Sequence, residues 1–121
     1  MVQAQVDLET PRGDDNIFDV VITSKTGKVV NLTGGTLKFT ARAKSGSPST
    51  VMTKTSAGGA GITFTDAING YAALTLVPAD TSALYAPVAL VFDFEFTDAL
   101  GKVTTVLPKG ILYVLRDITH A

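Results

Sequence analysis

The feature of this chain that most constrains its fold is a period-two alternation of apolar and polar residues, repeated in short segments along its length. Successive side chains of a β-strand point to opposite faces of the sheet, so this alternation is typical of strands with one buried face. It is clearest at residues 90–96, where three phenylalanines at spacing two share one face with Leu90, and Asp93 and Glu95 take the other. Because burial of each large apolar side chain stabilises a fold by about 1.5–3 kcal/mol, this segment is predicted to be the central core strand.

Turn-forming residues separate the alternating segments at intervals of roughly 8–12 residues, with no long amphipathic helix between them. This pattern predicts an all-β fold, an antiparallel β-sandwich or barrel of about eight or nine short strands. A weak segment around Lys54 is expected at a sheet edge, where a lysine discourages further pairing. The predicted strands lie at residues 2–8, 18–22, 29–32 (or a connector), 36–43, 50–55, 62–65, 71–76, 90–96, and 102–107 with 111–115 as one strand or a pair.

Glycine and proline at the segment boundaries predict how the strands connect. The Asn69-Gly70 pair predicts a turn. Pro108 predicts a β-bulge or a switch between sheets, because proline cannot donate a hydrogen bond to a strand ladder. The residues from Asp80 to Tyr85 predict at most one short helical turn, with Asp80 as its N-cap. Tyr85 could act as the tyrosine of an immunoglobulin E–F corner, although the strand that would carry it is expected to begin two or three residues later.

Length and composition bound the class of protein. A chain of 121 residues predicts a single domain over residues 1–121, large enough to bury a core. A hydrophobic content of 45% with 17% charged residues excludes disorder over most of the chain. The formal net charge of −1 argues against nucleic acid as a partner, since such binding normally needs a basic face. Without cysteine there is no disulfide, thiol nucleophile or cysteine-ligated metal.

Neither a membrane segment nor a secretory signal is expected. No stretch approaches the roughly 18 consecutive apolar residues that a membrane-spanning helix requires. The chain begins MVQAQVD, without the basic and apolar regions of a signal peptide. We therefore expect it to act where it is made, or to be carried elsewhere inside an assembly.

Metal and cofactor sites are not expected either. Asp14, Asp15 and Asn16, with Asp66 or Asp98 from another loop, offer oxygen ligands for Ca²⁺. They lack the spacing and the distal glutamate of a dedicated calcium loop. Carboxylates in solvated turns account for this pattern more simply.

Two further motifs have simple structural interpretations. The tripeptide Arg12-Gly13-Asp14 spells an integrin-binding sequence, but a strand-end turn uses the same residue types. The glycine-rich segment at residues 58–61 leads to a strand and not to the helix N-terminus that a phosphate-binding loop requires. It is interpreted as a flexible link.

No arrangement of residues indicates an enzyme. Asp93 and Glu95 share a strand face and could act as an acid–base pair, but a polar outer face is ordinary for a sandwich strand. His120 is the only imidazole and lies next to the last residue, where a side chain is seldom held rigidly enough for a catalytic triad. The chain is therefore expected to be non-enzymatic.

One segment departs from the pattern of one buried face and one solvent-exposed face. In residues 111–115 both faces are apolar, so the strand is either covered on both sides or contacts a partner with one face. We predict a partner interface on the face of Leu112 and Val114, joined by Val106.

The motifs also occur in a characteristic order. Taken together they resemble a widespread family of small structural proteins of tailed bacteriophages with an immunoglobulin-like sandwich, and the N-terminal domain of phage baseplate upper proteins, which docks receptor-binding modules to the tail. The resemblance spans nearly the whole chain. It is carried by RGD at 12–14, VNLTGGTLKFTAR at 30–42, GITFTD at 61–66, NG at 69–70, LVPADT at 76–81, FDFEFTD at 92–98, GILYV at 110–114 and DIT at 117–119.

The resemblance implies an immunoglobulin-like β-sandwich and a virion component that acts by protein–protein docking. Its partners would be capsid, neck or tail subunits in a symmetric multi-copy assembly. Baseplate upper proteins continue into a long C-terminal part that this chain lacks, so a head decoration, a neck or tail ornament or a connector is favoured. The alternatives are a baseplate or fibre adaptor, and a glycan or cell-surface binding module that uses the loops at residues 14–16 and 58–61.

Overall fold

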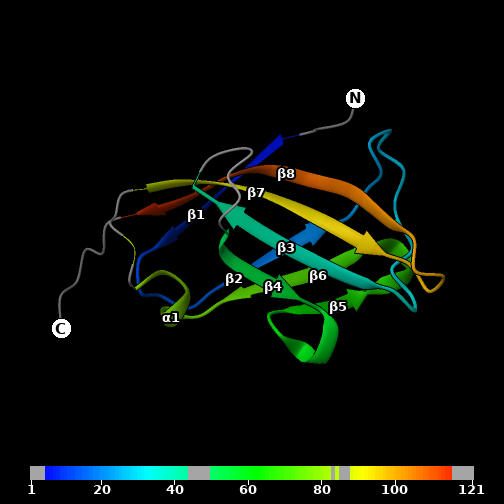
Figure 1. Ribbon diagram of the computed structural model, residues 1–121, viewed down its shortest axis with the longest axis horizontal. Coiled ribbons are helices and arrows are strands. Elements are labelled where there is room, and N and C mark those ends of the chain that lie inside the picture. The colour runs from blue at the N-terminus through cyan, green and yellow to red at the C-terminus, as the bar shows by residue number, and fades with distance from the viewer. Residues whose placement is uncertain (1–4, 44–49, 83, 85–87, 116–121) are drawn as a thin grey trace.

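The computed structural model describes residues 5–43, 50–82, 84 and 88–115, which fold into two β-sheets packed face to face (Figure 1). Eight strands are present in these residues, within the range expected from the sequence. Their bounds are β1 Gln5–Pro11, β2 Asn16–Val21, β3 Thr36–Arg42, β4 Thr50–Thr55, β5 Ile62–Asp66, β6 Tyr71–Leu76, β7 Val88–Thr97 and β8 Val103–Leu115.

The strand order defines an immunoglobulin-like sandwich. One sheet has the order β1-β8-β7-β3-β4 and the other has the order β2-β6-β5. Strands β2-β6-β5 against β8-β7-β3-β4 correspond to the B-E-D and G-F-C-C′ strands of immunoglobulin domains. The prediction of an all-β, immunoglobulin-like sandwich is confirmed.

One strand pair departs from the antiparallel prediction. β1 and β8 run parallel, with Gln5 opposite Lys109 and Pro11 opposite Leu115, whereas the other paired strands are antiparallel. These are the first and last strands of the described residues, so no hairpin forces them to run in opposite directions. Period-two alternation is the same in both kinds of pair and could not reveal this.

The core lies between the two sheets and contains three close phenylalanine rings. Phe39 of β3 and Phe92 and Phe94 of β7 are buried, and their ring centroids are 5.3–6.1 Å apart. Ile22 and Leu74 from the other side of the sandwich belong to the same buried cluster. β7 is the middle strand of the five-stranded sheet, which confirms the prediction for residues 90–96.

β8 changes its register with β7 in the middle, where Pro108 predicted a bulge. Phe92 lies opposite Gly110 but Phe94 lies opposite Val106, so β8 carries extra residues at this point. There Leu107 exchanges two backbone hydrogen bonds with Thr23, at 2.8 and 3.1 Å, just beyond the end of β2. The bulge therefore ties the five-stranded sheet to the other sheet while β8 continues as a single strand.

Short helical segments connect several strands, and they are more numerous than the sequence predicted. Helix α1 begins at Pro78, whose fixed φ suits the first position of a helix, two residues before the predicted start. Asp80 is consequently the third helical residue and not the N-cap. The predicted corner at Tyr85 lies outside the described residues. The segments are 3₁₀ turns η1 Ala57–Gly59 and η2 Ala67–Asn69, and α1 Pro78–Thr81.

The chain between β2 and β3 packs against the turn that precedes β6. Residues 29–32 form the extended connector that the sequence allowed, and Leu32 is fully buried. Its N–H donates to the carbonyl of Ala67 at 2.8 Å, and the N–H of Ile22 donates to the carbonyl of Gly70 at 2.8 Å. The Asn69-Gly70 turn is therefore held between two backbone segments.

Gly70 and Gly13 form a matched pair for a test of this packing. Their φ angles are +78° and +80°, but a Cβ at Gly70 would lie 2.8 Å from the carbonyl oxygen of Ile22, whereas Gly13 has open space. Gly13→Ala is expected to lower the free energy of unfolding by about 1–2 kcal/mol, the cost of the left-handed conformation alone. Gly70→Ala adds a backbone clash and should lower it by about 3 kcal/mol or more. Urea denaturation measures both, and equal losses would contradict the close approach at Gly70.

Candidate functional site

The structure decides which apolar face of β8 is accessible. Leu112 and Val114 are fully buried and Val106 is 2% exposed, all within the core cluster. The predicted partner interface on these three residues is therefore wrong, because they contact the interior. Leu112 lies opposite the buried Leu90 in the register of β7 and β8. With both faces apolar, alternation within β8 could not show which face meets the other sheet.

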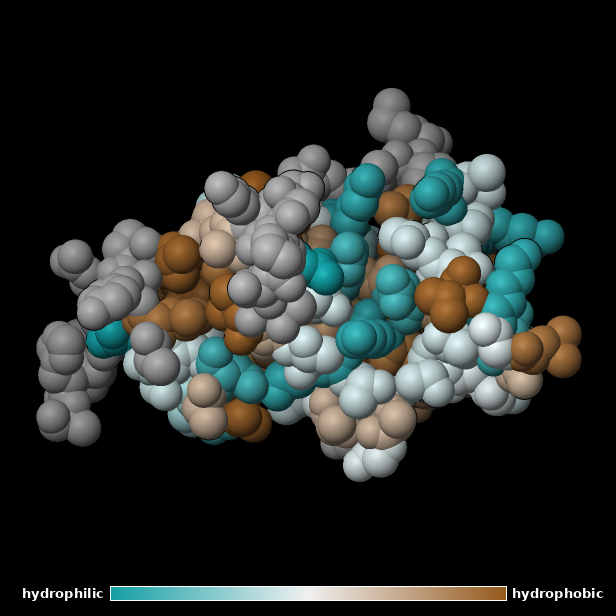
Figure 2. Space-filling model, in the orientation of Figure 1, coloured by the Kyte–Doolittle hydropathy of each residue, from teal (hydrophilic) through white to brown (hydrophobic). Residues whose placement is uncertain are grey.

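The outward residues of β7 and β8 form an apolar surface, termed the outer stripe. Cross-strand pairs build it, since Ala89 lies opposite Tyr113 and Val91 lies opposite Ile111. At its end a shallow depression of about 200 Å³ is bordered by Ala89, Tyr113 and Leu115, and Figure 2 shows brown surface where β7 begins and β8 ends. The members of the outer stripe are Ala89, Val91, Ile111, Tyr113 and Leu115.

Sequence reasoning missed the β7 half of this stripe. Ala89 and Val91 precede the clear alternation of the phenylalanines, in the continuous apolar run VALVF at residues 88–92. A run without alternation indicates a strand that is apolar on both faces. Together with the run at residues 111–115, it was the available signal that two neighbouring strands share an apolar outer face.

Charged residues flank the outer stripe on both sides. Asp7 and Glu9 of β1 are exposed in the strand next to β8. Arg42 of β3 lies opposite Val91 on the other side, and its Nη1 is 4.0 Å from Oδ2 of Asp93. The outer face therefore has an apolar centre, an acidic edge at β1 and a basic residue at β3.

Asp93 and Glu95 lie on this outer face, where the alternation placed them. Asp93 has Arg42 as a neighbour, and Glu95 lies opposite Lys38 in the register of β7 and β3. Each carboxylate is thus next to a basic residue on an open sheet surface. This arrangement fits a solvated strand face.

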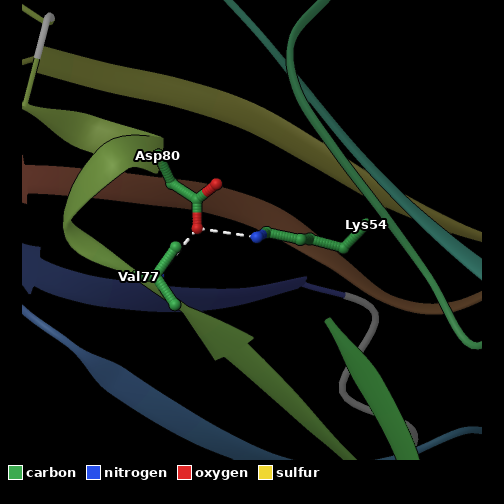
Figure 3. Close-up of polar contacts among 3 residues, drawn as sticks. All are labelled: Lys54, Val77 and Asp80. Carbon is green, nitrogen blue, oxygen red and sulfur yellow. Dashed lines mark hydrogen bonds and ion pairs between the residues drawn. The ribbon is translucent and has the colours of Figure 1, made fainter. Parts of the chain in front are cut away.

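An ion pair connects the edge strand β4 with α1, the turn that follows β6 (Figure 3). Nζ of Lys54 is 2.7 Å from Oδ2 of Asp80, and the two side chains are only 12% and 17% exposed. The same carboxylate oxygen accepts the N–H of Val77 at 2.7 Å. Gly61 makes room for the lysine, since a Cβ there would lie 2.4 Å from Cδ of Lys54. Lys54 is therefore an inward-pointing charge at a sheet edge, one of the features that discourage edge-to-edge pairing.

A groove of about 530 Å³ lies beside this pair and includes part of the glycine-rich segment. It offers threonine hydroxyls and backbone groups as hydrogen-bonding partners. Because Lys54 is paired with Asp80, an anionic ligand would have to compete with that carboxylate. The groove is lined by Thr53, Lys54, Ala60, Gly61, Thr63, Thr75 and Val77.

The Arg-Gly-Asp tripeptide forms the turn after β1. Nη1 of Arg12 donates to the carbonyl of Leu84 at 3.2 Å, and the N–H of Gly13 donates to Oγ1 of the buried Thr81 at 2.8 Å. Gly13 has φ +80°, which glycine tolerates without strain. Arginine and glycine thus join the first turn to α1, while Asp14 is exposed.

The acidic residues considered as calcium ligands lie in different turns. Asp66 accepts a hydrogen bond from a side-chain amide in its own turn, and Asp98 accepts two backbone N–H groups, each at 2.9 Å. Asp14 and Asp15 are exposed after β1. No cluster of three or more metal-ligating side chains occurs in the described ranges, and His120 lies beyond them.

The chain matches no protein-family model and no curated protein in sequence comparisons. In the part of the chain that the structure describes, no helix has the length and apolar character to cross a membrane. The fold, the outer stripe and the order of the sequence motifs are therefore the features on which a functional proposal can rest.

Neighbouring residues of β8 test which face is core. Val114→Asp places an unpaired carboxylate at a fully buried position and should cost more than about 4 kcal/mol, enough to unfold the domain. Tyr113→Asp alters an outward position and should leave the protein folded, at a cost of about 1 kcal/mol. Circular dichroism and thermal melting distinguish the two. Two variants of equal stability would contradict the orientation of β8.

The ion pair of Lys54 and Asp80 is expected to matter more than the exposed pair of Arg42 and Asp93. Asp80→Asn keeps an acceptor for the N–H of Val77 but leaves a largely buried ammonium without its counter-charge, which should cost about 2 kcal/mol. Asp93→Asn, the control, should cost no more than about 1 kcal/mol because its pair is open to solvent. Urea denaturation provides the comparison, and similar losses would show that burial does not strengthen the Lys54 pair.

Proposed function

We propose that this chain is a non-enzymatic structural subunit of a larger protein assembly. It acts by chain-to-chain contact through the outer face of its five-stranded sheet. The observation that carries the proposal is the outer stripe, an apolar surface on a face that antiparallel sheets ordinarily expose to water with polar residues. Val91, Ile111 and Tyr113 are half-buried, while Ala89 and Leu115 are exposed. Contiguous apolar surface that solvent reaches is typical of protein interaction sites.

The assembly that we propose is the virion of a tailed bacteriophage. The order of motifs at residues 12–14, 30–42 and 92–98 supports this, because it resembles small phage structural proteins. The immunoglobulin-like strand order is the one that the resemblance implies. In such a particle the subunit would be made in the host cytoplasm and present in many copies, as a head decoration, a neck or tail ornament or a connector.

Quantitative mass spectrometry of particles from the phage that encodes the chain tests this proposal. We expect the chain at a fixed ratio to a capsid, neck or tail protein, and that ratio identifies its position. Phage carrying Ile111→Asp should lose the chain from its particles, because a charge then interrupts the outer stripe. Thr63→Asp, at an exposed position of β5 in the other sheet, is the matched control and should be incorporated normally.

Absence of the wild-type chain from particles would overturn the virion assignment. Thermal melting with a panel of glycans would then test the alternative of a glycan-binding module. Normal incorporation of Ile111→Asp would instead show that the outer stripe is not the docking surface.

A further inference from the structure

One cross-strand row of the outer face carries opposite charges at its two ends. Asp7, Ile111, Val91 and Arg42 lie side by side on β1, β8, β7 and β3. The row therefore runs from acidic through two apolar residues to basic. A two-fold rotation about an axis parallel to the strands, between β7 and β8, reverses this order. In a face-to-face pair of chains, Asp7 of each copy would then meet Arg42 of the other.

The neighbouring rows are complementary under the same rotation. On one side Tyr113 of each copy meets Ala89 of the other, so a large ring covers a small side chain. On the other side the exposed Lys109 comes opposite Asp93, each lying one outward position beyond the first row. In three successive rows, the two copies thus place a large side chain against a small one, apolar side chains against each other, and an acidic side chain against a basic one.

The geometry of packed sheets allows these contacts. Face-to-face sheets lie about 10 Å apart and cross at about 30°. β1 and β3 would lie about 7 Å from the axis, so the crossing displaces Asp7 from Arg42 by about 4 Å. The long side chain of arginine can span this displacement, while the outer stripe lies close to the axis.

We propose that the occupant of the outer stripe is a second copy of this chain, in a two-fold dimer formed by the outer faces of β7 and β8. An interface of this symmetry is self-complementary, as the charged row requires. The inference deepens the proposed function and rests on it for its biological role, since the dimer would be the building block of the multi-copy assembly.

Charge reversal at the two ends of the row tests the dimer. Asp7→Arg alone places like charges at both symmetric contacts, and so does Arg42→Glu alone. Each should weaken dimerisation of the purified chain at least tenfold in sedimentation velocity. A mixture of the two variants should regain the dimer as a heterodimer, because each contact again joins opposite charges. Native mass spectrometry identifies the heterodimer by its mass.

Reversals elsewhere on the surface provide controls. Asp19→Arg on β2 and Lys25→Glu in the following loop change exposed charges outside the five-stranded sheet and should not affect dimerisation. Ile111→Asp should abolish the dimer by interrupting the outer stripe. Circular dichroism verifies that every variant is folded.

Three results would overturn the inference. The wild-type chain could remain monomeric into the millimolar range. The variants Asp7→Arg, Arg42→Glu and Ile111→Asp could all dimerise as strongly as the wild type, which would place the contact elsewhere. The mixture of the two folded reversal variants could stay monomeric. If the purified chain is monomeric but is present in virions, only the dimer is refuted. If it is dimeric but absent from virions, only the proposed function is refuted.

Discussion

The pairing of β8 with β7 is the contact on which the rest of the structure depends. β8 also pairs with β1, and through Leu107 it bonds to Thr23 beside the other sheet, so one strand holds three neighbours. Leu112 and Val114 point inward from it into the core. Because side chains alternate, the burial of these two residues leaves their neighbours Ile111, Tyr113 and Leu115 pointing outward. The outer stripe is thus fixed by the same pairing that builds the core.

An apolar outer face alone does not demonstrate a docking surface. Tyrosine, isoleucine and valine favour strands, and cross-strand pairs such as Val91 with Ile111 stabilise a sheet by about 0.2–1 kcal/mol each without a partner. Arg42 already has Asp93 as a partner within the sheet, at 4.0 Å, so the added information lies in the order of charges along the row. Asp7 and Arg42 lie too far apart in the strand order to be neighbours, yet they occupy one row on opposite sides of the stripe. A partner with the reverse order of charges accounts for that placement.

The sequence predicted those elements that local patterns determine. Phenylalanines at spacing two identified β7, and Pro108 identified the bulge of β8, because both effects act within one strand. The accessible face of β8 was assigned wrongly, since its residues are apolar on both sides and only the register with β7 distinguishes them. The pair of Lys54 and Asp80 was also missed, because a contact between distant segments has no local signal. The outer stripe was hard to predict for both reasons, because recognising it requires the orientation of β8 and its register with the neighbouring strand β7.

The charges also select one orientation of the two-fold axis. Rotation about an axis perpendicular to the strands would place β1 over β1, so that Asp7 and Glu9 would face their own copies, and Arg42 would likewise lie near its own copy on β3. Like charges in an interface oppose such a pairing. With the axis parallel to the strands, Arg42 faces Asp7 of the second copy while Lys109 faces Asp93, so signs alternate across the contact. The outer stripe would supply most of the affinity, and the charged residues would determine how the two copies are oriented.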